Sequence, residues 1–227
     1  MLGCLSLLVV VGSLCLMPFF LVEIMQTALR RLHLSPEVAL LAVMGIFIGS
    51  MINVPVYRIK RNEPQVIQTL GPFGPWFAPQ FQRVRQDTLI AVNVGGCVVP
   101  ALIALWQVLH LLDQGGWPVT AMLVAAGVNI AVCYRSAQPV SGVGILMPVF
   151  ASPITAVLAT WLLMMNPEYA VDRAPVAFVA GVAGPIIGAD LFHLRDLSRV
   201  SVGVLSIGGA GTFDGIVLSS FLAALLV

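Results

Sequence analysis

The sequence predicts an all-α fold: a polytopic membrane protein with about seven transmembrane helices. Of the 227 residues, 59% are hydrophobic and only 9% are charged, whereas soluble domains have about 45–50% apolar and about 25% charged residues. A bilayer span needs roughly 20 mainly apolar residues. Seven segments meet this requirement: 3–24, 38–57, 88–110, 118–136, 142–165, 174–194 and 201–227. Their connections are short apart from 58–87, which predicts a single integral membrane domain over residues 1–227.

The first segment and the basic residues together predict the orientation. Residues 1–22 carry no charged side chain. A signal peptide would begin with a basic region, so this stretch is expected to be the first span. Basic residues concentrate in cytoplasmic connections. The connections after the second, fourth and sixth spans contain eight Lys or Arg residues, against three after the first, third and fifth. We therefore expect a cytoplasmic N-terminus and an outside C-terminus, in the cytoplasmic membrane of a bacterium or archaeon.

The connection 58–87 differs from the others in its composition. Its central segment, Gly71–Pro79, contains three prolines and two glycines. Proline and glycine at this density exclude a regular helix. Aromatic residues beside arginines suit the cytoplasmic headgroup layer, so packing at the membrane surface is expected. A lid over an inner vestibule is the alternative.

Glycine and proline also interrupt several of the expected helices. The fifth span contains Pro148 and Pro153, and the seventh contains a run of small residues, Gly208–Gly211. Such a run weakens a helix enough to predict a break, and a broken helix at membrane depth needs protein or water to cover its free backbone groups. With 206–211 unwound, Thr212 is the expected N-cap of the last helix, which would begin beside Asp214.

Two pairs of short motifs predict an internal repeat. Gly45–Ser50 in the second span resembles Gly184–Ala189 in the sixth, and Asn93–Gly96 in the third resembles Ser206–Gly209 in the seventh. The order and the direction of the spans agree. They predict a parallel duplication of three spans, residues 3–110 and 142–227, joined by a linker helix over 118–136. Parallel repeats are a known transporter design, with substrate sites where the repeats meet.

Asp190 and Asp214 are the strongest functional candidates, because they lie inside hydrophobic segments. Every other acidic residue falls in or beside a short polar connection. A charged side chain at the bilayer centre costs roughly 2.5–3.5 kcal/mol on insertion scales, and intramembrane carboxylates usually mark ion, proton or substrate paths. Two structural alternatives remain open: Asp214 as a helix cap, and Asp190 as the partner of a neighbouring Arg or Asn.

Three further residues complete the predicted substrate- or ion-binding site. His193 lies three residues after Asp190 and shares its helix face, so it could relay a proton to the cytoplasm. Asn53 and Asn93 in the first half are neutral amides that can hydrogen-bond a protonated or solvated carboxylate. The spacing of the acidic residues and His193 matches no strong metal motif. We therefore expect no metal and no cofactor.

Five segments resemble the uncharacterised membrane family catalogued as domain of unknown function 1614. The resemblance covers about residues 40 to 227 and implies a membrane protein, without implying an activity or a catalytic residue. The segments that carry it are Gly49–Pro55, Val92–Gly96, Pro139–Ile145, Gly188–Leu191 and Ser206–Gly215.

A fainter resemblance links the two aspartates to presenilin-type and prepilin-type proteases. Those enzymes use two aspartates on adjacent spans, one of them in a Gly-x-Gly-Asp motif. Here Gly188-Ala189-Asp190 lacks the first glycine, and Phe213-Asp214 lacks the expected Tyr-Asp pairing. The order of the two elements is also reversed, which lowers the expectation of a protease.

The leading functional prediction is a small proton- or ion-coupled transporter built around Asp190 and Asp214. The alternatives are an intramembrane aspartyl protease, in which both aspartates would be catalytic, and an accessory or assembly subunit of a larger membrane complex. The expected partners are the lipid bilayer and other membrane subunits. The net charge of +1 argues against a nucleic-acid partner. A carboxyl–carboxyl approach within hydrogen-bonding reach would favour the protease, carboxyl groups that face Asn53 or Asn93 across a cavity would favour transport, and aspartates without a cavity would favour the accessory subunit.

Overall fold

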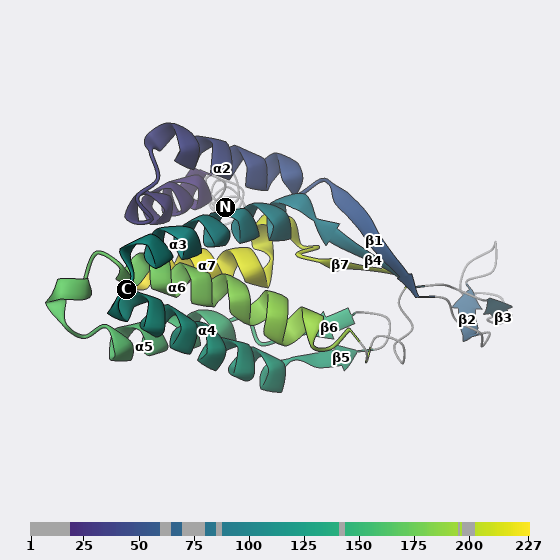
Figure 1. Ribbon diagram of the computed structural model, residues 1–227. Coiled ribbons are helices and arrows are strands. Elements are labelled where there is room, and N and C mark those ends of the chain that lie inside the picture. Colours follow the sequence, from purple (N-terminus) through teal and green to yellow (C-terminus); the bar gives the residue numbers. More distant parts are fainter. Residues whose placement is uncertain are drawn as a thin grey trace, which may run out of the picture.

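The computed structural model describes residues 19–59, 65–69, 80–84, 88–140, 144–194, 196 and 203–227, with the backbone alone for 65–69 and 80–84. Within these residues the helices lie side by side at one end of the molecule. The strands gather at the other end (Figure 1). The prediction of a mainly helical chain is thus confirmed in its coarse form. The prediction that the chain contains helices alone was wrong.

The helices begin with a segment over 19–31 and continue to the C-terminus. They are α2 (Pro36–Gly49), α3 (Val99–Gln114), α4 (Trp117–Ser136), α5 (Ala151–Leu163), α6 (Arg173–Ala183) and α7 (Gly215–Leu226). Two π-helical segments extend them, η2 (Val94–Val98) before α3 and η4 (Gly184–Leu191) after α6. Two short 3-10 turns, η3 (Pro167–Tyr169) and η6 (Gly211–Phe213), complete the set in the described residues.

Three of these helical stretches are long and apolar enough to cross a membrane: Val94–Gln114, Trp117–Ser136 and Arg173–Leu191. They correspond to parts of the third, fourth and sixth predicted spans. The helices α2, α5 and α7 are apolar but shorter. Of the first predicted span, 3–24, only the residues from 19 onward lie within the described part of the chain.

The strands form three small sheets. The largest has the order β1 (Asn53–Ile59), β4 (Thr88–Asn93), β7 (Val204–Ile207), with β1 antiparallel and β7 parallel to β4. The antiparallel pair β2 (Gln65–Thr69) and β3 (Gln80–Val84) extends away from the helices (Figure 1). The antiparallel pair β5 (Gln138–Val140) and β6 (Gly144–Leu146) lies between α4 and α5 in the chain.

These strands replace parts of four predicted helical spans. The span 38–57 is helical only to Gly49, and in the described parts of the spans 88–110, 142–165 and 201–227 a strand precedes the helix. A short apolar run looks the same in a strand and in a buried helix, because composition alone does not reveal its period. Pro55 gives a physical reason in β1, since proline removes a helical N–H donor. The central segment of the connection, 70–79, lies outside the described residues, so its surface or lid role stays a prediction.

The predicted repeat has a partial counterpart in the order of elements. In both halves a strand is followed by a glycine pair and then a helix: β4 before α3, and β7 before α7. The two glycine pairs meet, because a Cβ on Gly96 would collide with the carbonyl oxygen of Gly208. The other matched pair has different neighbours. Gly49 lies against Gly95, whereas Gly188 lies against Ile130 of α4. Superposition of the two halves stays a prediction.

A buried polar cluster fastens the helices together. The amide of Asn129 on α4 donates to the Ser152 hydroxyl on α5 at 2.9 Å and to the carbonyl oxygen of Ala180 on α6 at 2.7 Å. The Ser152 hydroxyl also hydrogen-bonds the hydroxyl of Ser219 on α7. All three polar side chains are fully buried. Since buried polar groups are costly unless paired, this cluster holds α4 to α7 in one arrangement.

Candidate functional site

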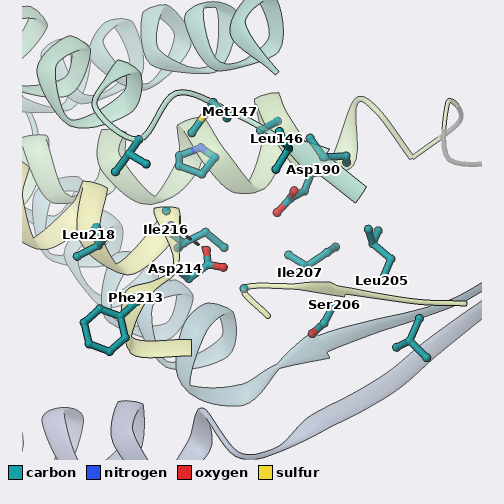
Figure 2. Close-up of a pocket in the computed structure, with 17 residues that line it drawn as sticks. Leu146, Met147, Asp190, Leu205, Ser206, Ile207, Phe213, Asp214, Ile216 and Leu218 are labelled. Atoms are coloured by element: carbon teal, nitrogen blue, oxygen red, sulfur yellow. Dashed lines mark hydrogen bonds between the residues drawn. The ribbon is translucent and has the colours of Figure 1, made fainter. Parts of the chain in front are cut away.

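Asp190 and Asp214 line one cavity. It has a volume of about 280 Å³ and lies between η4, β6, β7 and the start of α7. Figure 2 shows both carboxyl groups directed into the space between η4 and β7, Asp190 from η4 and Asp214 from the beginning of α7. No hydrogen bond joins the two carboxyl groups in the described part of the chain. Since a water molecule occupies about 30 Å³, the cavity is large enough for water as well as a ligand.

The π-helical geometry of η4 sets the position of Asp190. Pro185 lacks an N–H donor, and the N–H of Phe192 donates to Ile187 O, five residues back, at 3.1 Å. Such wide turns are frequent at functional sites, because they redirect side chains that a regular helix would place elsewhere. Gly188 lets η4 approach α4 closely, since a Cβ there would collide with the carbonyl oxygen of Ile130.

Asp214 is the N-cap of α7. Its Oδ1 accepts a hydrogen bond from the N–H of Ile216 at 3.0 Å, and its Oδ2 accepts one from the N–H of Ala210 at 3.2 Å. The expected unwinding before it is present: β7 ends at Ile207 and a turn follows, with φ of +72° at Gly208. Such a φ suits glycine, which has no Cβ.

Thr212 was wrongly predicted as the cap. It lies in η6, one turn before α7, and its hydroxyl hydrogen-bonds the hydroxyl of Ser50 at 3.2 Å. The capping role of Asp214 and its place in the cavity coexist, because two backbone donors leave further lone pairs on the carboxylate.

Asn53 and Asn93 lie together but do not line the cavity. The Asn93 amide donates to Asn53 Oδ1 at 3.1 Å and to the carbonyl oxygen of Ser50 at 2.8 Å, and Asn93 Oδ1 accepts from the N–H of Gly96 at 2.7 Å. The Ser206 hydroxyl donates to Asn53 Oδ1 at 2.6 Å. Ser206 does line the cavity. The two asparagines therefore join β1, β4 and β7 behind the cavity wall.

His193 is buried and follows Asp190 closely in the sequence, but it is not among the residues that line the cavity. Its Nδ1 lies 2.9 Å from the carbonyl oxygen of Ala189, and its ring lies 4.9 Å from the ring of Tyr134. Within the described ranges, no group of three or more His, Cys, Asp or Glu side chains comes together as a metal site.

The cavity also has walls that sequence reasoning missed. Consecutive residues of β6 and its end, Ile145 to Met147, form one side, and consecutive residues from Val204 to Gly208 form another. The signal available in the sequence was the proximity of these segments to the motifs at 139–145 and 206–215. Their strand conformation was not predicted, so neither was their contact with the aspartates.

Comparison with known proteins gives a family. A family model described as "Protein of unknown function (DUF1614)" matches residues 47–226, most of the chain. No curated protein and no solved structure matches the chain. The chain belongs to the DUF1614 family, as its motifs predicted.

Proposed function

We propose that this member of the DUF1614 family is an integral membrane protein that hydrolyses peptide bonds with Asp190 and Asp214, as an intramembrane aspartyl protease. The observation that carries the proposal is the shared cavity. Two carboxyl groups from separate elements, η4 and the start of α7, line a single cavity. Two carboxyl groups in one site can exist in different protonation states, which is what acid–base hydrolysis requires.

A membrane location is supported by the apolar outer surface of the helices. Besides the three helices of sufficient length, large apolar side chains are exposed along α2, α3, α4 and α5; Leu41 is 70% exposed and Leu162 is 73% exposed. Large exposed apolar surfaces mark contact with a membrane or a protein. We propose that lipid covers these faces.

The seven-span topology is compatible with the strands, because a short helix and a strand together reach across a bilayer. The twelve residues of α7 span about 18 Å at 1.5 Å each, and the four residues of β7 add about 13 Å. Their sum is close to the roughly 30 Å of the hydrocarbon core. In this arrangement Asp214 lies at the junction of strand and helix, deep in the membrane.

The hydrogen bonds support different roles for the two carboxyl groups in this proposal. Asp214 accepts from two backbone N–H groups, which stabilises its ionised form, so it acts as the general base. Asp190 accepts no hydrogen bond within the described part of the chain and starts protonated. Asp214 takes a proton from water as the water oxygen adds to the peptide carbonyl carbon, and Asp190 donates its proton to the carbonyl oxygen. The C–N bond then breaks, Asp214 protonates the leaving nitrogen, and the product hydroxyl returns a proton to Asp190.

Proton- or ion-coupled transport is the second candidate. It is favoured by the interruptions on both sides of the cavity: α6 continues as a π-helix, and β7 gives way to α7 through a turn. Broken spans around a midplane site are typical of transporters. Asn53 and Asn93 do not face the carboxyl groups across the cavity, which removes one argument for transport. No hydrogen bond joins the two carboxyl groups in the described residues, so the closer approach expected of a protease is not met either. The cavity itself counts against a purely accessory subunit.

Purified protein in lipid nanodiscs, incubated with internally quenched apolar peptides, tests the proposal. Mass spectrometry of the products identifies the cleaved bond. Asp190→Asn and Asp214→Asn should each reduce the cleavage rate by at least about 100-fold, since general acid–base catalysis contributes about 10²–10⁴. Asp113→Asn is the matched control, because Asp113 is exposed near the end of α3.

Equal cleavage by all variants would contradict the proposal. Absence of cleavage, combined with proton flux in proteoliposomes that Asp190→Asn abolishes, would favour the transporter instead.

A further inference from the structure

We infer that the cavity binds an extended segment of a membrane polypeptide, which adds as a strand to the open edge of β7. The inference rests on the proposed function and names its substrate class and binding mode. In the described residues β7 has one neighbour, β4, and is the edge strand of its sheet. Exposed edge strands are templates for pairing with another chain.

The backbone pairing of β7 shows which groups are free. The carbonyl oxygen of Gly203 accepts from the N–H of Leu89 on β4 at 3.0 Å. In a strand, alternate residues direct their N–H and C=O groups to the same side, so Leu205 and Ile207 also face β4, in keeping with their register. Val204 and Ser206 therefore direct theirs to the opposite edge.

One of these outward groups already has a partner. The carbonyl oxygen of Ser206 accepts from the N–H of Gly209 at 3.0 Å. Among the described residues, the N–H and C=O of Val204 and the N–H of Ser206 have no backbone partner, so they are available to an incoming chain. This short ladder ends at the turn that leads to Asp214, so a paired segment would pass directly to the carboxyl groups.

The cavity runs along this edge. Five consecutive residues, Val204 to Gly208, line it. A cavity lined by consecutive residues of a strand extends along the direction of that strand. The strand β6 forms the opposite wall but is not paired with β7. Figure 2 shows β7 passing beneath Asp190, with Leu205 and Ile207 beside the space.

The backbone groups of β7 and the apolar side chains beside it suit an extended segment with apolar residues. A helical segment pairs its own N–H and C=O groups internally and leaves none for β7. An extended chain is narrower and presents its own N–H and C=O groups. Unpaired backbone groups at membrane depth cost several kcal/mol, so a substrate that unwinds is stabilised by pairing with β7. The side chains of Ile145, Met147 and Leu205 suit apolar substrate residues.

The substitution Val204→Pro tests this inference. It removes the outward N–H while leaving the hydrogen bonds to β4, and proline is tolerated on edge strands where the N–H is unpaired. Val204→Ala is the matched control, because it shortens the same side chain and keeps the N–H. Both substitutions are made in Asp190→Asn protein so that the probe is not cleaved. The probe is a short fluorescent peptide of Val, Leu and Ala, and its Kd is measured by anisotropy in nanodiscs.

Val204→Pro should weaken binding about three- to tenfold relative to Val204→Ala, the loss expected for one backbone hydrogen bond. Thermal unfolding of each variant checks the fold. A series of singly N-methylated peptides, bound to protein with an intact β7, provides an independent measurement. Methylation at alternate positions should weaken binding, because only alternate N–H groups of a strand face its neighbour.

Equal affinity for all N-methylated peptides would overturn the inference. If peptides are cleaved but methylation has no alternating effect, the proposed function stands and the strand-addition mode fails. If the alternating effect is present but the parent protein cleaves nothing, the binding mode stands and the protease proposal fails.

Discussion

The substitution Asn93→Ala should destabilise the protein, because Asn93 makes three hydrogen bonds from a fully buried position. It donates to Ser50 O and Asn53 Oδ1 and accepts from the N–H of Gly96. Each intramolecular hydrogen bond contributes about 0.5–1.5 kcal/mol net, so their sum is about 3 kcal/mol. The truncation also leaves the buried Gly96 N–H without its partner, which places the expected loss at or above this sum.

Equilibrium unfolding of purified protein in mixed detergent micelles, followed by circular dichroism, measures this loss. Gln138→Ala is the control, because Gln138 is exposed on β5, and an exposed substitution should change the free energy of unfolding by less than about 0.5 kcal/mol. Asn93→Asp separates the contributions, since it keeps the acceptor for Gly96 and removes both donors. If Asn93→Ala unfolds within about 0.5 kcal/mol of the parent, the fastening role assigned to this asparagine is wrong.

Three further predictions concern packing, coupling and topology. Gly96→Ala should displace the turn after β7 and lower both stability and activity, because the added Cβ would collide with the backbone of that turn. Gly127→Ala is the control: Gly127 has open space around it, so this change should be neutral or stabilising in thermal unfolding. The double variant Asp190→Asn with Asp214→Asn should be no less active than either single variant in the cleavage assay, as expected for residues that act as a unit; a further large loss would indicate independent roles. Reporter fusions within 60–85 and at the C-terminus should report opposite sides of the membrane, and the same side for both would exclude seven spans.

The two aspartates could be identified from composition alone, and their functional role stays a prediction. A carboxylate within an apolar segment is visible in any sequence, and its cost at membrane depth makes a functional role the first hypothesis. The break before Asp214 was equally visible, because the Gly208–Gly211 run weakens a helix in any context. The sequence did not show which residue caps the following helix, since Thr212 and Asp214 are both good N-caps. Only the path of the turn selects Asp214.

The strands could not be predicted in the same way. The segments that became β4 and β7 are short apolar runs of four to six residues, too short to show whether their period is that of a strand or a helix. Their pairing joins residues more than a hundred positions apart in sequence. The cavity between β6, β7 and η4 depends on this pairing, so it could not be predicted from the sequence.

The amino-acid sequence by itself determined the helical, apolar character of the chain, its family and the presence of two carboxylates within apolar segments, because these depend on residue type and local order. Tertiary structure alone decided which polar groups meet. It brought Asp190 and Asp214 to one cavity, and it moved Asn53 and Asn93 into a hydrogen-bonded cluster behind β7. The physical reason is that a side chain's neighbours depend on strand pairing and on close helix contacts between distant segments. Glycines such as Gly96 and Gly188 permit these contacts, but their presence in the sequence does not indicate which segment will be the partner.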